Sequence, residues 1–263
     1  MKSDQTPPRL RRLLVALGAA TLLAGCATTG SVPHPDDPYE GFNRGMFKFN
    51  QRVDKYTLRP VARVYDTVAP NVVQKGVTNF FGNIGDIWIG ANNILQGKVG
   101  DGIQDWMRFL VNSTWGIGGL IDIASDAGLT KHDEDFGQTL ATWGVGEGPY
   151  VVLPLFGPRF LRDAVALPVD LIADPVGHVS DVRVRNSATG LRLTQNRATA
   201  LGLEKTVRQG SLDQYGFVRD FYLQQRRYNV NDGNVTIEYE DFDAPADESA
   251  DSPFPASSTE NPQ

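Results

Sequence analysis

The chain has little cysteine, no long apolar run and few signs of β-structure. Cys26 is the only cysteine among 263 residues, which excludes a disulfide within the chain. After Cys26 no segment approaches the roughly 18 consecutive apolar residues of a membrane-spanning helix. Alternating runs joined by Asn-Gly or Asp-Gly turns are missing too, so we expect few strands. The fold must therefore depend on helix packing.

Catalytic signatures are also absent. The sequence contains no Gly-x-Ser-x-Gly elbow, no His-Glu-x-x-His zinc helix and no phosphate-binding loop. His132 lies in an acidic stretch without the spacing of a hard-cation loop, which indicates a solvated loop. The pairs Arg162-Asp163 and Arg219-Asp220 are sequence neighbours that should not face each other on a helix, so we expect partners elsewhere or a polar surface. We predict a protein that is not an enzyme and has neither metal nor cofactor.

The N-terminus carries a processing signal. Residues 13–23 are apolar, follow three arginines and lead into Leu-Ala-Gly-Cys. A basic start, a short apolar segment and small residues before the cut describe a secretory signal. The last four residues are similar to a bacterial lipobox, which predicts cleavage before Cys26 and acylation of its thiol and amine. Because no aspartate follows to resemble an inner-membrane retention signal, we predict a lipid anchor in the periplasmic leaflet of the outer membrane.

Charge is distributed unevenly. Cleavage before Cys26 would leave 21 basic against 30 acidic residues, which argues against a nucleic-acid partner. Nine of the acidic residues lie between Tyr228 and the C-terminus, where Lys and Arg are missing. Such a segment buries too little apolar surface to offset its ordering entropy. We predict a signal peptide over 1–25, a lipidated flexible linker over 26–36, one folded domain over 37–233 and an acidic disordered tail over 234–263.

Apolar residues recur with helical period through most of the domain. We predict a first helix over 38–58, with Asp37 as N-cap, Glu40 completing a capping box and Arg59-Pro60 as its end. A second, short helix follows and ends at Pro70. Further helical faces lie within residues 73–81, 87–95, 99–112, 191–207 and 212–228, the last led by Ser211 as N-cap. The predicted fold is all-α, in a single domain of amphipathic helices.

The middle of the chain combines glycine with tryptophan. Fifteen of the 27 glycines and all four tryptophans lie between Gly82 and Gly157. Glycine permits tight turns, and tryptophan favours sites with one apolar and one wet edge. Short helices turning beside a lipid–water boundary and a compact helical core with glycine turns both fit this composition. The apolar patches 116–121 and 150–156 are long enough for monotopic attachment in addition to the lipid anchor.

Ordered sequence blocks from about residue 36 to residue 233 resemble the MlaA lipoproteins, also called VacJ. The blocks are Asp37-Pro38-Tyr39-Glu40-Gly41-Phe42-Asn43-Arg44, Gly82-Asn83, Asn93-Ile94-Leu95-Gln96-Gly97, Arg108-Phe109-Leu110-Val111-Asn112-Ser113-Thr114, Gly116-Ile117-Gly118-Gly119-Leu120-Ile121-Asp122, Phe136-Gly137-Gln138-Thr139-Leu140, Gly144-Val145-Gly146-Glu147-Gly148-Pro149-Tyr150, Leu153-Pro154, Gly157 and Arg162-Asp163. So many blocks in order are a stronger signal than any single motif.

The resemblance implies a ring-like monotopic protein with a central amphipathic passage for phospholipids. Members remove mislocalised phospholipids from the outer leaflet of the outer membrane, pass them to a soluble periplasmic carrier and associate with trimeric porins. The candidate residues that line the passage are Gly116, Gly118, Gly119, Ile121 and Asp122. The three glycines leave room for a lipid, but they are equally suited to turns.

The stretch 125–135 aligns with a flexible hairpin that gates the passage in the family. Its candidate gating residues here are Gly128, Leu129, Thr130 and Lys131, and the stretch is markedly acidic. Two other functions stay open. A structural envelope lipoprotein without transport activity would organise partners through its acidic tail and helical surface, and a lipid hydrolase would need a nucleophile that the sequence does not reveal.

Overall fold

The computed structural model describes residues 34–234, apart from the side chains of 205, 206 and 208–210. Cys26, the predicted signal peptide and the predicted tail after Asn234 lie outside the described residues. Within 34–234 there are nine α-helices, one 3-10 helix and one two-stranded sheet. The elements are α2 (Glu40–Tyr56), α3 (Leu58–Val68), α4 (Asn71–Leu95), α5 (Val99–Thr114), α6 (Ile123–Asp126), α7 (Phe136–Thr142), β1 (Tyr150–Leu153), β2 (Gly157–Phe160), α8 (Leu161–Ala173), η1 (Pro175–His178), α9 (Val182–Gly210) and α10 (Gln214–Val230). The predicted all-α fold is confirmed.

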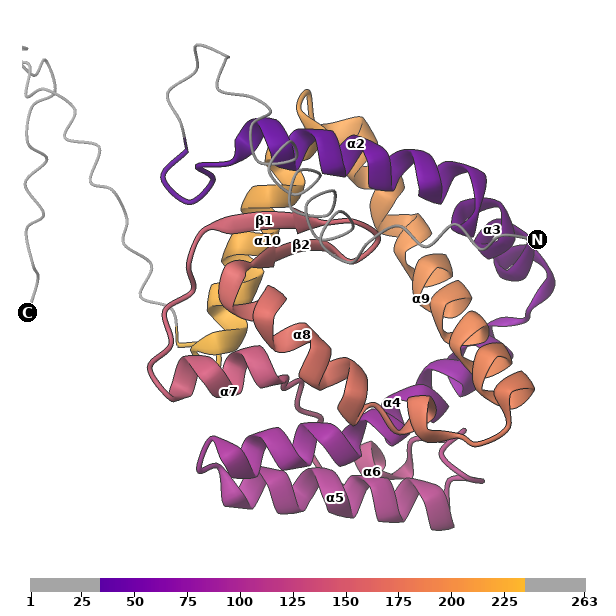
Figure 1. Cartoon of the computed structure of the whole chain (residues 1–263). Helices are drawn as coiled ribbons and strands as arrows, with labels where there is room; N and C mark the ends of the chain where they lie inside the picture. Colours follow the sequence, from indigo (N-terminus) through magenta and orange to yellow (C-terminus); the bar gives the residue numbers. More distant parts are fainter. Residues whose placement is uncertain (1–33, 235–263) are drawn as a thin grey trace, which may run out of the picture.

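The elements follow one another around a ring (Figure 1). Helix α2 contacts α3, α3 contacts α9, and α9 contacts α4. From α4 the contacts continue through α7 and α8 to the β1–β2 hairpin, which returns to α2. The α4–α5 helix pair forms one side of the ring, and α10 packs behind the hairpin (Figure 1).

Helix α4 corrects one expectation from the sequence. The faces predicted within 73–81 and 87–95 belong to a single helix of 25 residues. No proline lies between Asn71 and Leu95, and the interior glycines Gly82 and Gly85 keep helical geometry. A glycine in a helix costs only about 1 kcal/mol relative to alanine, which packing against α5 offsets.

Three predicted helix ends were wrong. Asp37 does not cap α2, because its buried carboxylate accepts hydrogen bonds from the Asn43 side chain at 2.8 Å and from the Tyr215 hydroxyl. Asp213, not Ser211, caps α10 by accepting from the Tyr215 amide at 3.1 Å. The first helix ends at Tyr56, before Pro60, which sits in the first turn of α3. A first-turn amide has no partner within its helix, so proline loses no bond there.

The β1–β2 hairpin joins the apolar core to α2. The strands pair antiparallel, with Tyr150 opposite Phe160. The Asn43 side chain donates to the Tyr150 carbonyl at 3.0 Å and accepts from the Val152 amide at 2.8 Å, which continues the sheet pairing onto the helix. The buried apolar cluster consists of Tyr150, Val152, Phe160, Tyr215 and Leu223. This core is small for the length of chain around it.

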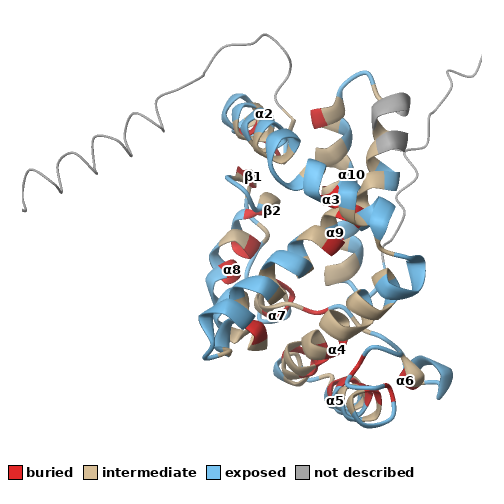
Figure 2. Ribbon diagram, turned by 90° about the vertical axis from the view of Figure 1, so that its right-hand side faces the viewer, coloured by how far each residue is buried: buried red, intermediate tan, exposed pale blue. Residues whose placement is uncertain are grey.

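Buried residues are otherwise spread thinly. Figure 2 shows them as short red segments distributed over most elements, among much larger exposed surfaces. Among the described residues, sixteen polar or charged residues are buried against eleven hydrophobic ones. No helix within 34–234 is both long and apolar enough to cross a membrane.

Candidate functional site

The α4–α5 pair packs through a polar, glycine-lined seam. A Cβ atom on Gly90 would lie 2.8 Å from the Gly102 carbonyl oxygen, and one on Gly102 would lie 2.7 Å from the Gly90 carbonyl oxygen. Next to this close approach, the Asn93 side chain donates to the buried Asp105 carboxylate at 2.8 Å. The polar faces of both helices therefore turn inward, and the absence of side chains at two positions lets the backbones meet.

The apolar face of α5 points outward as a result. Its exposed residues are 42–58% accessible and recur with helical period: Val99, Ile103, Trp106, Met107 and Leu110. Helix α3 has a similar outward face, 37–74% accessible: Leu58, Val61, Val64 and Val68. In a protein surrounded by water these faces would form the core. In α5 the amphipathic pattern is inverted, with polar residues inside and apolar residues outside, whereas the one buried residue of α3 is Ala62.

Two of the tryptophans also expose apolar surface. The indole N–H of Trp106 donates to the Ile87 carbonyl at 3.1 Å, and that of Trp143 donates to the Leu95 carbonyl at 3.0 Å. Both side chains are nevertheless about half exposed. Because the protein itself satisfies these polar atoms, the exposed ring surfaces need no water. Such indoles suit contact with an apolar medium.

A buried arginine organises the region after α5. Arg108 is almost fully buried, and its guanidinium contacts both carboxylate oxygens of Asp122 at 3.0 Å. Partial burial alone would raise the pKa of Asp122, but hydrogen bonds from Ser125, Asn112 and Arg108 lower it to about 2. Asp122 also caps α6 by accepting from the Ser125 amide at 3.2 Å. These contacts fix the turn between α5 and α6.

The candidate passage residues lie in this turn, and the three glycines differ in their surroundings. A Cβ on Gly116 would overlap the Ile121 carbonyl oxygen, and one on Gly119 would lie 2.6 Å from the Asn83 amide nitrogen. Gly118 has no atom within 4 Å of a Cβ position and is exposed, as is Ile121. Close backbone packing explains Gly116 and Gly119, while Gly118 and Ile121 have open space beside them.

The candidate gating residues are held against α4 and α5. Gly128 takes φ +82° where α6 ends, which returns the chain toward the helix pair. The Leu129 carbonyl accepts from Arg108 at 2.5 Å, and the Lys131 ammonium donates to the Gly82 carbonyl at 3.0 Å and contacts the Asp86 carboxylate. Thr130 is exposed between these two anchors. Residues 125 and 126 of the predicted loop belong to α6.

Burial and charge act in opposite directions at Asp86. Its carboxylate is inaccessible to solvent, and burial raises its pKa even though Lys131 and Arg108 lie beside it. The Arg108 Nε atom is 3.7 Å from Asp86 Oδ2. The Lys131 contact thus supplies part of the charge that this buried carboxylate needs.

The acidic stretch around His132 is docked, which differs from the solvated loop predicted from the sequence. His132 Nδ1 lies 2.9 Å from the Oδ1 atom of buried Asp105. Glu134 is buried too, with its carboxylate 2.8 Å from the Gln96 amide nitrogen and 3.2 Å from the Lys98 ammonium. His132 thus contacts the inward polar face of α5, and Glu134 contacts the turn between α4 and α5.

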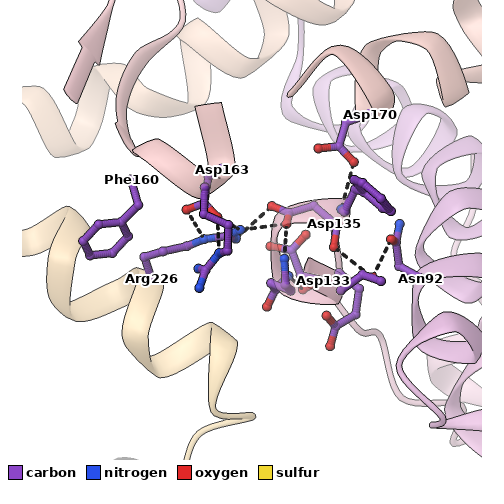
Figure 3. A network of polar contacts seen from close by, with 12 residues as sticks. Asn92, Asp133, Asp135, Phe160, Asp163, Asp170 and Arg226 are labelled. Atoms are coloured by element: carbon purple, nitrogen blue, oxygen red, sulfur yellow. Dashed lines mark hydrogen bonds and ion pairs between the residues drawn. The ribbon is translucent and has the colours of Figure 1, made fainter. Parts of the chain in front are cut away.

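A second charged network joins α7, α8 and α10. Figure 3 shows Arg226 reaching from α10 toward Asp163 and Asp135. Its guanidinium contacts Asp163 at 2.8 and 2.9 Å and Asp135 at 2.7 and 2.8 Å. Burial alone would raise the pKa of Asp163, but its bonds to Arg226 and Arg162 lower it. A Cβ on Gly137 would lie 2.6 Å from the Arg226 guanidinium, so the network requires the glycine.

The prediction that neighbouring Arg and Asp residues do not face each other was wrong for two pairs. Arg162 Nε lies 3.1 Å from Asp163 Oδ1, and Arg219 Nε lies 2.8 Å from Asp220 Oδ1. Arg162 and Asp163 are the second and third residues of α8, where burial brings both side chains to the same network. The predicted partners elsewhere also exist, namely Arg226 for Asp163 and Asp37 for Arg219.

The inward polar face of α4 and α5 was missed in the sequence. Its residues were available as a helical pattern of polar and glycine positions: Asn83, Asp86, Gly90 and Asn93 in α4, and Gly102, Asp105 and Asn112 in α5. The sequence interpretation followed the apolar residues, so it did not recognise that the polar ones made the contact.

Comparison with known proteins identifies the family to which this helical ring belongs. A family model described as "MlaA lipoprotein" matches residues 35–229, which is nearly the whole described structure. The chain belongs to the MlaA lipoprotein family. The resemblance of the ordered blocks is thereby confirmed.

Individual relatives of the MlaA family cover most of the chain. The Escherichia coli (strain K12) "Intermembrane phospholipid transport system lipoprotein MlaA" is 36% identical over 232 residues, covering 86% of this chain and 91% of that protein. An "Uncharacterized protein" of Rickettsia bellii is 34% identical over 195 residues, covering 74% and 76%. A solved chain from "Structural basis for maintenance of bacterial outer membrane lipid asymmetry" has a TM-score of 0.64 and 35% identity, and the match covers 74% of this chain and 99% of that one.

Proposed function

We propose that this chain is an outer-membrane lipoprotein that removes mislocalised phospholipids from the outer leaflet and passes them to a periplasmic carrier. Acylated Cys26 anchors the domain in the periplasmic leaflet, and a trimeric porin holds the complex beside the lipids that it collects. The relatives named as intermembrane phospholipid transport lipoproteins support this proposal. No covalent chemistry is needed, so the protein is not an enzyme.

The observation that carries the proposal is the pair of exposed apolar faces on α3 and α5. Contiguous exposed apolar faces on a soluble monomer usually mark an interface or a membrane contact. An interfacial helix buries its apolar face several Å into the boundary of head groups and acyl chains. Faces of this kind on two separate parts of the ring would seat the domain in one leaflet.

A transporter in this position lowers the large free-energy barrier to moving a phospholipid out of the bilayer. A phospholipid has about 30 methylenes, and exposing each costs about 0.8 kcal/mol, so bringing the lipid into water costs on the order of 20 kcal/mol. An amphipathic passage shields the chains and keeps the head group wet. In this proposal Gly118 and Ile121 face the lipid path, and residues 128–131 gate it when the Lys131 contact with Asp86 opens.

The proposal is tested in cells that lack the gene. Phospholipid in the outer leaflet is expected to rise, and the wild-type gene is expected to restore asymmetry. A variant with Ile103→Asp and Leu110→Asp on the outward face of α5 should fail to restore it at normal protein abundance, while Lys75→Asp at an exposed polar position should succeed. Unchanged outer-leaflet phospholipid in the deletion strain would sink the proposal.

The acidic C-terminal segment favours one alternative, a structural envelope scaffold without transport activity. Truncation after Gly233 separates the two functions. Lipid asymmetry should survive truncation if the protein is a transporter, whereas a scaffold that works through this segment should lose its envelope partners. If deletion of the whole gene disrupts the envelope partners but leaves lipid asymmetry normal, the scaffold function is favoured.

A further inference from the structure

A basic groove lies between α2, α3, α9 and the start of α10. It has a volume of about 780 Å³. Six cationic residues line it: Lys48, Arg52, Lys55, Arg59, Arg63 and Arg197. Apolar side chains, among them Phe47, Leu203, Val207 and Val218, also line it, and Glu204 is its one acidic lining residue among those described. The groove thus offers positive charge beside apolar surface, and nothing in the proposed transport role uses it.

Only part of this charge is neutralised within the fold. Arg59 Nε lies 3.1 Å and Arg197 Nε lies 2.6 Å from the Asp54 carboxylate, and both arginines also contact Glu204. Within residues 34–234, no ion pair joins Lys48, Arg52, Lys55 or Arg63 to an acidic side chain. All four are exposed. Like charges gathered in a groove raise its potential and attract anions.

The matching negative charge lies in the same chain. Residues 34–234 hold 21 basic and 22 acidic residues, so the described part is nearly neutral. Residues 235–263 hold eight acidic residues and no Lys or Arg. Four of the eight, Asp243, Asp247, Glu248 and Asp251, lie 9 to 17 residues beyond Asn234, and Phe242 precedes the first of them. This segment carries the negative charge that complements the cationic side of the groove, and Phe242 matches its apolar side.

Chain length allows the segment to reach the groove. Gln214 and Val218, near the start of α10, line the groove, and the segment leaves beyond the other end of this helix. A helix of 17 residues spans about 25 Å. The carboxylates from Asp243 to Asp251 follow Asn234 by 9 to 17 residues, and chains of those lengths reach at most about 30 to 60 Å. Attachment to the same molecule also gives the segment an effective concentration in the millimolar range, which a separate weak ligand rarely reaches.

We propose that the acidic C-terminal segment of this chain binds in the basic groove. Its carboxylates pair with Lys48, Arg52, Lys55 and Arg63, and Phe242 packs on the apolar side of the groove. The bound carboxylates occupy the positions that other anions, including phospholipid head groups, would take. This inference does not depend on the proposed transport function, because it concerns a contact within one molecule.

Carbodiimide crosslinking of the full-length protein in zwitterionic nanodiscs tests the contact. The reagent joins a lysine amine to a carboxylate in direct contact, and mass spectrometry identifies the joined peptides. Lys48 and Lys55 should crosslink to residues 243–251 more strongly than Lys75, which is exposed on α4 outside the groove. Arg52→Glu should reduce these crosslinks about fivefold, the effect of losing about one exposed ion pair. Arg183→Glu, the same charge change at the exposed start of α9, should leave them unchanged.

A full-length variant with Asp243→Asn, Asp247→Asn, Glu248→Gln and Asp251→Asn gives an independent measurement. Freed of its internal ligand, the groove should bind phosphatidylglycerol vesicles several-fold more strongly than the wild type, and Arg52→Glu should cancel this gain. The proposal is overturned if Lys48 and Lys55 crosslink to the segment no more than Lys75 does. It is also overturned if vesicle binding depends on Arg52 but not on the four acidic residues, because an anionic lipid is then the occupant.

Discussion

Asp122 combines structural roles that a turn residue rarely has. It caps α6, pairs with buried Arg108 and accepts from Asn112 at 3.0 Å. These donors favour its ionised form, so its pKa falls from 3.8 to about 2. The turn that holds the candidate passage residues is therefore stabilised by one carboxylate charge.

A pH dependence follows for this residue. Because the folded-state pKa lies below the unfolded value, the stabilisation is complete above about pH 5 and is lost as pH falls toward 2. Asp122→Asn should lower the free energy of unfolding by about 1 kcal/mol at pH 7, since the side chain is partly exposed and solvent weakens the interaction. Denaturant unfolding at pH 7 and near pH 2 measures the gap, which should close at low pH. Asp126→Asn in exposed α6 should show no comparable gap, and an equal Asp122 gap at both pH values would contradict the account.

At the scale of elements, the α4–α5 seam should make adding a methyl group to a glycine more destabilising than removing a large apolar side chain. Gly102→Ala places a Cβ 2.6 Å from Ile94 and 2.7 Å from the Gly90 carbonyl oxygen, which should cost about 1–3 kcal/mol through forced separation of the helices. Ile103→Ala, one residue along, removes a larger but outward side chain and should change stability by less than about 1 kcal/mol in detergent. Thermal unfolding of both variants gives the comparison. A larger loss for Ile103→Ala would show that the apolar face is the packed one.

Sequence periodicity predicted these helices but not their orientation. The spacing of Ile103, Trp106 and Leu110 predicts a helix with two unlike faces, whichever medium each face meets. Which face packs against protein depends on whether water or lipid surrounds the fold, and the local pattern carries no such information. The seam at Gly90 and Gly102 is recognisable only once α4 and α5 are known to pair. The joined helix α4 was missed because glycines suggest a break that packing can overcome.

The ring as a whole depends on ion pairs between elements that are distant in sequence. Arg226 connects α10 to α8 and α7 through two carboxylates, and Tyr222, which packs against the small apolar core, also donates to Asp163 at 3.1 Å. Sequence alone did not pair Arg226 with Asp163, since 63 residues separate them. Such pairs are set by the closed shape and have no local signature.

Two adjacent arginines on α10 test the importance of the buried ion pairs. Arg226→Gln leaves Asp163 buried without its main partner and should cost about 3–5 kcal/mol. Arg227→Gln removes contacts with Glu147 and Asp36 at a position that is 39% exposed, and should cost less than about 1 kcal/mol. Chemical unfolding of both variants in the same detergent measures the difference. Equal losses would mean that burial of the Arg226 ion pairs contributes little to ring stability.

Cys26 determines where the ring operates in the proposed function. Cys26→Ala should prevent lipidation, move the protein away from the outer membrane and abolish lipid asymmetry. Membrane fractionation, metabolic labelling with a fatty acid and an outer-leaflet phospholipid assay check the three effects. Cys26→Ala protein that maintains asymmetry normally would refute the need for an anchor.

The central claim is that the outward apolar faces of α3 and α5 lie in lipid. Nitroxide labels at Val64, Ile103 and Leu110, with Arg183 as the exposed polar control, test it directly in phospholipid bilayers by relaxation with oxygen and with a water-soluble nickel complex. The account predicts that oxygen relaxes the three apolar positions more strongly than nickel does, with the opposite ranking at Arg183. Greater relaxation by nickel at all four positions would contradict it, because those faces would then lie in water.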